Sequence, residues 1–223
     1  TISPLVSTDG TVNHIAIIIY DVTDIAANRN ALEKANQELE SLSRTDMLTQ
    51  LNNRGFWEEC LSQEFSRFQR YQTTCSVVMF DIDHFKKVND SWGHEAGNIA
   101  LQAVADCMRN CFRKLDVVCR YGGEEFAVIL PATEALVAVQ VAERLRKSIE
   151  AMVVDISDTQ ATAMSINLTA SLGVGIFTRH SKLNGKELVQ QADEFLYQAK
   201  QQGRNQVCYA INKLESEAEV TVD

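Results

Sequence analysis

The sequence predicts an α/β protein with one main sheet covered by helices. Two segments, 76–83 (SVVMFDID) and 126–130 (FAVIL), are nearly continuous apolar runs, which are typical of central strands buried on both faces. Two further segments repeat apolar residues at helical spacing, and such helices need a sheet to cover. These repeats are Leu101, Val104, Ala105, Met108, Cys111 and Phe112, and Ala138, Val141, Ala142, Leu145 and Ile149.

The first element along the chain is a hairpin. Residues 1–22 alternate weakly between apolar and polar, and turn residues at 7–10 separate a short strand from a stronger one at 12–20. The string SPLVSTDGTVNHIAIIIYDVTDI resembles the last two strands of a PAS sensor domain and its exit into a helix. This resemblance implies a PAS C-terminal fragment at 1–23, with most of the sensor preceding Thr1.

The second element is a long helix with the spacing of a coiled coil. Its seam alternates steps of three and four residues, and the other faces are nearly all polar. The seam positions are Ile25, Asn28, Leu32, Ala35, Leu39 and Leu42. We expect a parallel dimeric coiled coil as a signalling helix at 24–45, and a single amphipathic helix packed on its own domain is the alternative.

The main domain is expected at 46–210, with a C-terminal tail at 211–223. Its helices show apolar residues with a period near 3.6, and Gly122-Gly123 joins two of its strands as a tight primed hairpin turn would. The expected order is helix 54–71, strand 75–81, short helix 84–90, helix 95–113, strand 117–121, strand 125–130, helix 133–152, strand 168–177, helix 185–201 and a final strand near Val207.

Composition disfavours several classes of protein. A net charge of −9 and a pI near 5.0 argue against a nucleic-acid binder. The longest apolar run, 15–20, is far shorter than a membrane-spanning helix, so no membrane segment is expected here. The six cysteines contain no CxxC pair, which indicates a reduced, cytoplasmic protein. Cys107 and Cys111 lie one helical turn apart but lack a matching His or Cys pair for zinc.

Carboxylates lie where the two central strands are expected to end. They are Asp81, Asp83, Glu124 and Glu125. If the strands pair, Asp81 and Glu124 converge on one divalent cation, and such a set without His or Cys suits Mg²⁺. Because Mg²⁺ completes its shell with substrate phosphates, the pattern predicts nucleotide chemistry. Asp83 has an alternative role as the N-cap of the helix that follows, and the double glycine alone is an ordinary hairpin. His84 and His94 are assigned structural roles.

Five motifs in register resemble the GGDEF-type diguanylate cyclases across residues 46–207. They are DMLTQLNNRGF at 46, FDIDHFKKVNDSWGHEAGNIAL at 80, RKLDVVCRYGGEEF at 113, ASLGVGIF at 170 and ADEFLYQAKQQGRN at 192. The third motif holds the GGEEF variant, which keeps the carboxylate. The fold that this resemblance implies is a sheet of about five strands flanked by helices, related to the palm of nucleotide cyclases.

The resemblance also implies an activity and the residues that carry it. Two GTP molecules condense into cyclic di-GMP with release of two pyrophosphates, and each subunit of a homodimer holds one GTP. The implied catalytic residues are Asp81, Glu124, Glu125 and Lys86, and the implied ligands of Mg²⁺, or alternatively Mn²⁺, are Asp81, the Ile82 carbonyl and Glu124. The implied substrate contacts are Phe85, Lys86, Asn89, Asn98, Gly122, Gly123, Lys200 and Arg204.

Two features bear on selectivity and regulation. Asn98 stands where the family usually has an Asp that accepts two guanine N–H bonds, so guanine selectivity is in question. Arg113 and Asp116 form an Arg-x-x-Asp pair like the family's inhibitory product site, for which a helix-terminal Arg beside a loop Asp is the alternative. Two other functions remain open: a catalytically silent cyclic di-GMP receptor, and a cyclase with relaxed purine specificity.

Overall fold

The computed structural model describes residues 2–6, 12–17, 44–157, 164–177 and 184–210. The chain divides into two compact units, 1–43 and 44–223. In the first, β1 (Ile2–Val6) pairs antiparallel with β2 (Val12–Ile17), which confirms the predicted hairpin. The coiled-coil seam predicted at 25–42 lies outside the described residues and stays a prediction. In the described part of the chain, no helix is long and apolar enough to cross a membrane.

The second unit is built on one six-stranded sheet, which confirms the predicted fold class. Its strand order is β10-β9-β4-β6-β5-β3, and β4 pairs antiparallel with both β6 and β9. The strands are β3 (Asn52–Asn53), β4 (Cys75–Ile82), β5 (Val117–Gly122), β6 (Glu125–Pro131), β9 (Ala170–Phe177) and β10 (Val207–Tyr209). The strand beyond the expected five is β3, which adds two residues beside β5 at the sheet edge.

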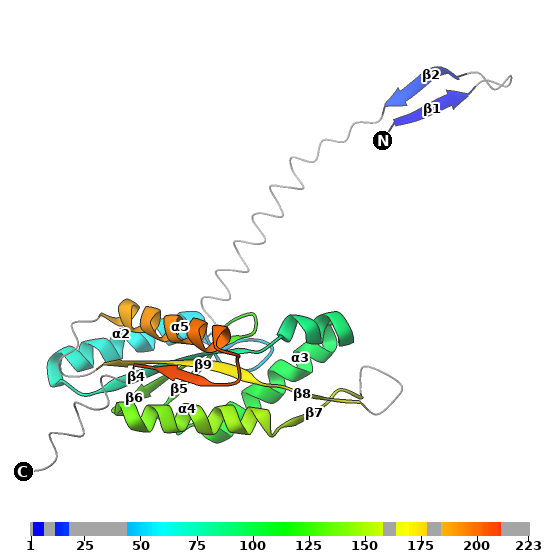
Figure 1. The fold of residues 1–223 in the computed structure, drawn as a ribbon. Coiled ribbons are helices and arrows are strands. Elements are labelled where there is room, and N and C mark those ends of the chain that lie inside the picture. The colour runs from blue at the N-terminus through cyan, green and yellow to red at the C-terminus, as the bar shows by residue number, and fades with distance from the viewer. Residues whose placement is uncertain (1, 7–11, 18–43, 158–163, 178–183, 211–223) are drawn as a thin grey trace, which may run out of the picture. The chain divides into compact units, whose positions relative to one another are not determined.

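Helices cover both faces of this sheet, as the ribbon shows (Figure 1). On one face, α2 (Arg54–Tyr71) and α5 (Gly185–Gln201) enclose a core that includes Val77 and Met79. On the other, α3 (Phe85–Cys111) and α4 (Ala135–Glu150) pack over Val78 and Phe80. Every residue of β4 is buried, because its alternate side chains enter two different cores.

The two helices predicted at 84–90 and 95–113 are the two parts of α3. They meet at Gly93, whose backbone is not helical (φ 83°, ψ 167°) and whose positive φ suits glycine. The prediction did not include a small hairpin formed by β7 (Val153–Asp155) and β8 (Ser165–Asn167). Each of these strands has three residues and buries only the central one, which leaves too little pattern to read from sequence.

The position of α5 is fixed by close packing on β9 and by a cap at its start. A Cβ atom at Gly173 of β9 would lie 2.0 Å from the carbonyl oxygen of Ala192, so only glycine allows this approach. At its start, α5 has a capping box in which the Asn184 side chain accepts from the backbone N–H of Glu187. Because both its start and its face are fixed, the last turn of α5 places Lys200 at the end of β4.

Candidate active site

The candidate site lies where β4 ends between β6 and β9. Asp81 is 7% exposed and stands opposite Glu125 of β6 and Ser171 of β9. The next residue, Ile82, donates its backbone N–H to the carbonyl oxygen of Glu124 at 3.3 Å. The pairing expected for the two central strands therefore exists, and it brings Asp81 and Glu124 to the same end of the sheet.

The turn that carries Glu124 differs by one position from the prediction. Gly122 still belongs to β5 and pairs with Glu125, so the two turn residues are Gly123 and Glu124 rather than Gly122 and Gly123. The reason is an irregularity in β5 between Arg120 and Gly122, which shifts the register by one residue. Gly123 takes the positive φ of 49° that the turn needs.

Lys200 supplies positive charge to this carboxylate site. Its Nζ atom lies 2.8 Å from Oδ2 of Asp81. Burial raises the pKa of Asp81 above its usual value, the charge of Asp83 adds to this, and Lys200 and Arg204 oppose it. Burial also raises the pKa of Glu124, and the charge of Asp81 contributes. Both carboxylates would thus be stabilised in their ionised form by a nearby cation.

The donor atoms fit a hard divalent cation. Asp81 and Glu124 offer carboxylate oxygens, and Ile82, the residue after Asp81, offers a backbone carbonyl oxygen. Among the described residues, no group of three or more His, Cys, Asp or Glu side chains is arranged to hold a metal ion. A cation held by two carboxylates would leave coordination positions for phosphate oxygens, which is how Mg²⁺ commonly binds nucleotides.

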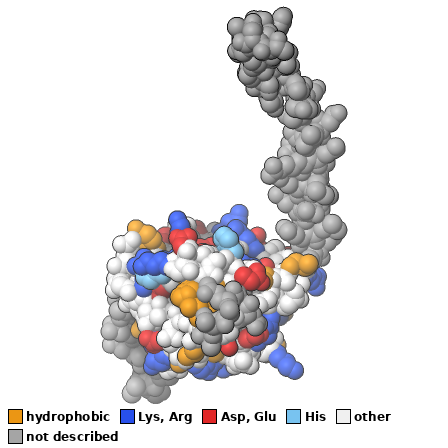
Figure 2. Space-filling view, turned by 90° about the vertical axis from the view of Figure 1, so that its right-hand side faces the viewer, with side chains coloured by type: hydrophobic (Ala, Val, Ile, Leu, Met, Phe, Trp, Pro, Cys, Tyr) orange, Lys and Arg blue, Asp and Glu red, His pale blue; other side chains and the backbone are white. Residues whose placement is uncertain are grey.

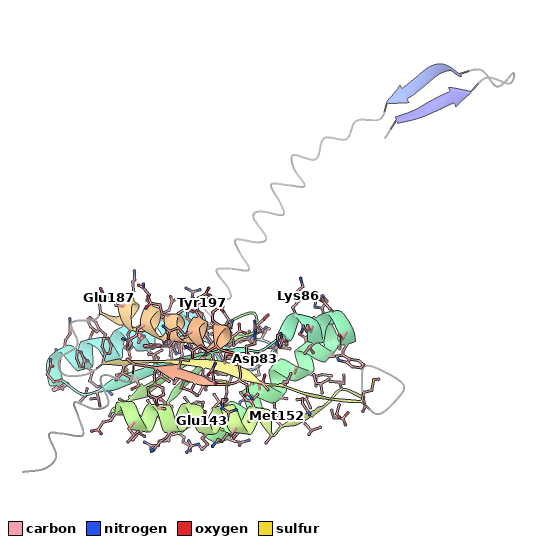
Figure 3. All side chains as sticks on the ribbon, viewed as in Figure 1. Asp83, Lys86, Glu143, Met152, Glu187 and Tyr197 are labelled. Atoms are coloured by element: carbon pink, nitrogen blue, oxygen red, sulfur yellow. The ribbon has the colours of Figure 1, made fainter. Side chains whose placement is uncertain are left out.

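Apart from Gly122, Gly123 and Lys200, the predicted substrate-binding residues lie on α3 and after α5. Phe85 is buried at the start of α3, whereas Lys86 is exposed on the outer side of this helix (Figure 3). Asn89 rests against Gly97, where a Cβ atom would fall 2.0 Å from Oδ1 of Asn89. Asn98, the next residue after Gly97 in α3, is half-buried. Because Gly97 lies against Asn89, the two predicted guanine contacts lie near each other on either side of the Gly93 kink. Arg204 is exposed in the bend that follows α5.

Asp83 is not the cap of α3. His84 occupies the N-cap position with a φ of 58° and makes no side-chain cap bond. The Asp83 carboxylate instead turns toward β9, where it accepts from the hydroxyls of Thr169 at 2.8 Å and Ser171 at 2.7 Å. A third donor, the backbone N–H of Asn205, lies 3.0 Å away. These buried donors outcompete the capping role because they satisfy both oxygens of a carboxylate that is 6% exposed.

The Arg113–Asp116 pair forms a closed turn between α3 and β5. The Asp116 carboxylate accepts from the backbone N–H of Arg113 at 2.8 Å, and the Asp116 N–H donates to the Arg113 carbonyl at 3.0 Å. The turn is therefore held by backbone atoms of Arg113. Its side chain is exposed and is not needed to keep the turn closed.

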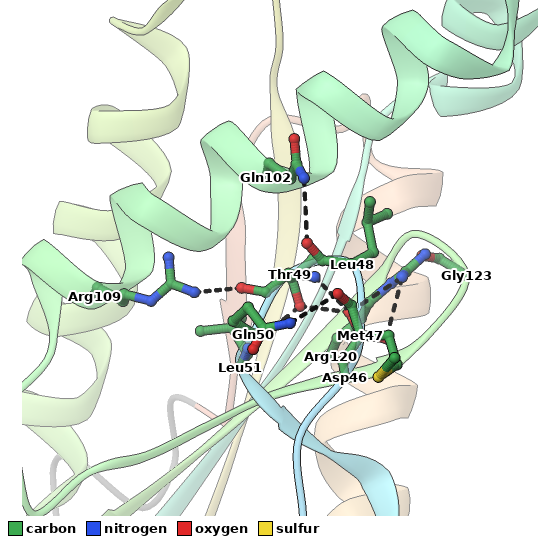
Figure 4. Close-up of polar contacts among 10 residues, drawn as sticks. All are labelled: Asp46, Met47, Leu48, Thr49, Gln50, Leu51, Gln102, Arg109, Arg120 and Gly123. Atoms are coloured by element: carbon green, nitrogen blue, oxygen red, sulfur yellow. Dashed lines mark hydrogen bonds and ion pairs between the residues drawn. The ribbon is translucent and has the colours of Figure 1, made fainter. Parts of the chain in front are cut away.

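A connection that the prediction did not include joins the start of the domain to the hairpin of β5 and β6 (Figure 4). Arg120 donates through Nε and Nη2 to the Gly123 carbonyl oxygen at 2.9 and 2.8 Å, and through Nη1 to the Asp46 carboxylate. Asp46 also accepts from the backbone N–H and the hydroxyl of Thr49. In the sequence, only the charge of Arg120 within an otherwise apolar strand indicates such a contact. The partner, Asp46, could not be identified because it lies 74 positions away.

This connection predicts an acid-dependent loss of stability. Although burial alone would raise the pKa of Asp46, its bonds from Thr49 and the charge of Arg120 lower it. Because the pKa is lower in the folded state, Asp46 stabilises the fold above its unfolded pKa, and this contribution is lost as pH falls through the folded value. Asp46→Asn should therefore reduce the free energy of unfolding by about 1 kcal/mol or more at neutral pH.

The check is urea unfolding of the parent and of Asp46→Asn from about pH 7 to about pH 3. The difference between the two proteins should shrink toward acid pH, because the parent carboxylate becomes protonated. A difference that does not change with pH would contradict the role of Asp46. Asp90→Asn, a change at an exposed position of α3, is the matched control.

Comparisons with known proteins identify the class to which this fold and site belong. The family model "Diguanylate cyclase, GGDEF domain" matches residues 43–206. The chain belongs to the GGDEF family.

Individual relatives agree with this assignment. "Diguanylate cyclase A" of Treponema denticola is 36% identical over 200 residues, covering 88% of this chain and 51% of that protein. The coiled coil and GGDEF domain of DgcB from Caulobacter crescentus, crystallised with c-di-GMP, superposes with a TM-score of 0.71 at 28% identity, covering 85% of this chain and 97% of that one. An active GGEEF domain from Vibrio cholerae gives 0.63 at 27% identity, covering 71% and 96%. The chain spans about half the length of the Treponema relative.

Proposed function

We propose that this chain is the output part of a diguanylate cyclase, which condenses two GTP molecules into cyclic di-GMP and two pyrophosphates. The observation that carries the proposal is the meeting of Asp81, Glu124 and Lys200 at the end of β4, with a 2.8 Å contact between Lys200 and Asp81. Two acidic groups and a cation suit a triphosphate bound through a metal. Membership of the GGDEF family supports the choice of GTP.

In the proposed reaction, the 3′-hydroxyl oxygen of one GTP bonds to the α-phosphorus of the other, and the bond to pyrophosphate breaks. A second step of the same kind, in which the two nucleotides exchange roles, closes the ring and releases the second pyrophosphate. Asp81, Glu124 and the Ile82 carbonyl would hold Mg²⁺ or Mn²⁺, which neutralises phosphate charge when bound. Lys86, Lys200 and Arg204 bind phosphate oxygens, and the free N–H groups at Phe85 and Lys86 face the same anion. Glu125 accepts the proton of the attacking hydroxyl.

The proposed reaction needs two copies of the domain, because each copy presents one GTP. Dimerisation through the predicted coiled coil would place the two half-sites opposite each other. Acidic and basic side chains are interspersed on the face seen in Figure 2, and the net charge is −9. Bulk attraction to a polyanion therefore does not explain binding, and the local cations must select the nucleotide.

The test is a nucleotide-resolved assay with Mg²⁺ or Mn²⁺ and with GTP and ATP, separately and mixed. We expect cyclic di-GMP from GTP, with activity per chain that falls on dilution below the dimerisation range. Cyclic di-GMP binding without turnover would overturn the proposal in favour of a silent receptor. Adenine-containing products would favour a cyclase with relaxed purine specificity.

Asn98 is the residue that motivates this last comparison. An amide offers guanine one acceptor oxygen where a carboxylate offers two, so one guanine N–H is poorly paired. Asn98→Asp should lower the apparent KM for GTP by about five- to a hundredfold and strengthen rejection of ATP. Steady-state kinetics with both nucleotides measure this. Unchanged KM in Asn98→Asp, together with complete exclusion of ATP by the parent, would show that position 98 does not set selectivity.

A further inference from the structure

The chain makes an unusual bend between α5 and β10. Three successive residues have positive φ angles: Gly203 at 117°, Arg204 at 66° and Asn205 at 45°. Glycine adopts such angles readily and Asn tolerates them, but the Cβ atom and long side chain of Arg make them unfavourable for Arg204. A left-handed Arg–Asn pair persists only where its surroundings hold it in place. The contacts of Asn205 identify those surroundings.

Asn205 is bonded in three directions. Its backbone N–H donates to Oδ2 of Asp83 at 3.0 Å, and its side-chain Oδ1 accepts from Nη1 of Arg146 at 2.8 Å. Its Nδ2 donates to Oε1 of Glu150 at 2.7 Å. The side chain therefore uses both a donor and an acceptor, which an amide provides and a carboxylate does not.

Two of the three partners of Asn205, Asp83 and Arg146, are themselves fixed. Asp83 is buried at the end of β4 and is bonded by two hydroxyl groups, that of Ser171 in β9 and that of Thr169 just before this strand. Arg146 of α4 is 11% exposed, and it donates to Glu143 at 2.8 and 2.9 Å and to Glu150 at 2.8 Å. Figure 3 shows Asp83 beside the sheet and Glu143 on α4. The bend is thus held between the sheet and a helix that carries no proposed catalytic residue.

Two cations lie at this bend: Lys200 precedes it in the last turn of α5, and Arg204 belongs to it. Lys200 contacts Asp81, and Arg204 is the second of the three positive-φ residues, four positions further along the chain. The backbone N–H of Arg204 donates to the Ala199 carbonyl, so the bend also closes the end of α5. A shift of the bend would move Arg204 directly and Lys200 through the helix end.

We propose that Asn205 and Asp83 are positioning residues of the cyclase, which hold Arg204 and Lys200 against the triphosphate of the bound GTP. This inference rests on the proposed function. Neither residue touches substrate; each acts through the bend. The proposal gives α4, through Arg146 and Glu150, a part in arranging the phosphate site.

The sharpest test exchanges donor and acceptor between two positions. Asn205→Asp places a carboxylate against Glu150 and removes the donated bond, so the bend should shift. Combining it with Glu150→Gln restores a donor and an acceptor with their order reversed, while Arg146 keeps its acceptor at position 205. We expect Asn205→Asp to lower kcat/KM for GTP by about 10- to 100-fold and the double variant to recover most of this loss.

Further readouts separate positioning from a merely structural role. The thermal midpoint of unfolding and the affinity for cyclic di-GMP at the Arg113 turn should stay near the parent values in Asn205→Asp, while KM for GTP rises. Asn110→Asp, the same change at an exposed position of α3, is the control and should leave kinetics unaltered. Asp83→Asn, which turns an acceptor into a donor facing hydroxyl and N–H groups, should raise KM as well.

Two kinetic results would overturn the proposal. One is kcat/KM in Asn205→Asp within about threefold of the parent. The other is a double variant that folds as stably as the parent but recovers no activity. Calorimetry with a non-reactive GTP analogue separates this inference from the proposed function. A parent that binds the analogue but forms no cyclic di-GMP rejects the function, whereas equal affinity in the parent and in Asn205→Asp rejects the positioning role.

Discussion

Replacing Glu124 with Gln should lower the rate of cyclic di-GMP formation by about a hundredfold or more, without unfolding the domain. Glu124 stands in the two-residue turn between β5 and β6, where its carbonyl oxygen is tied to the N–H of Ile82. Gln keeps this backbone bond and the side-chain shape. It removes the negative charge that, with Asp81, would hold the divalent cation, so the loss should appear in kcat.

The electrostatics of the site explain why the variant should stay folded. The pKa of Glu124 is raised in the folded protein by burial and by Asp81, so the ionised side chain destabilises the fold above that pKa. Glu124→Gln removes this penalty. The free energy of unfolding should therefore be no lower than that of the parent, and the difference in favour of the variant should grow as pH rises through the Glu124 pKa.

The measurement is a rate assay at saturating GTP, paired with denaturant unfolding at two pH values. Asp81→Asn should lose activity in the same way, and Glu59→Gln, on the exposed side of α2, is the matched control. A folded Glu124→Gln protein that keeps activity within about tenfold of the parent would reject the assignment of Glu124 to the metal.

The parts of the fold that sequence predicts well are those with long periodic patterns. The strands β4 and β9 are eight residues each and wholly buried, and the amphipathic faces of α3 and α4 are equally clear. The strands missed are β3, β7 and β8, which have two or three residues. Short strands depend on pairing with distant segments, and a local pattern carries no information about such pairing.

The residues of the site also fall into those that a local sequence pattern identifies and those whose contacts come from distant parts of the chain. Asp81 and Glu124 could be selected because acidic residues that end an apolar strand or follow a double glycine are out of place. Arg120 and Asn205 could not, since their partners, Asp46 and Glu150, lie 74 and 55 positions away. The capping alternative for Asp83, which the structure does not show, has the same origin: a local cap is visible in sequence, whereas bonds from the distant hydroxyls of Thr169 and Ser171 are not.

Replacing Arg113 with Ala should weaken binding of cyclic di-GMP at the inhibitory site predicted from the Arg-x-x-Asp pair by about ten- to a hundredfold, while leaving the initial rate nearly unchanged. The guanidinium is exposed and offers a planar fork to guanine or phosphate. Asp116 holds the turn through backbone atoms of residue 113, which alanine retains. The variant therefore removes the predicted ligand contact without opening the turn, and Arg113 precedes the start of β5 whereas Glu124 follows its end.

Lys114→Ala provides the matched control, because it removes an exposed cation from the same turn but not from the Arg-x-x-Asp pair. Calorimetry with cyclic di-GMP, and progress curves with and without added product, measure the two quantities separately. In Arg113→Ala, the progress curve should stay linear to higher product concentration than in the parent or in Lys114→Ala. Equal weakening in both variants would mean that the turn attracts the product by net charge alone. Unaltered affinity in Arg113→Ala would assign this arginine to the surface of a helix end, with product inhibition, if present, arising at the GTP site.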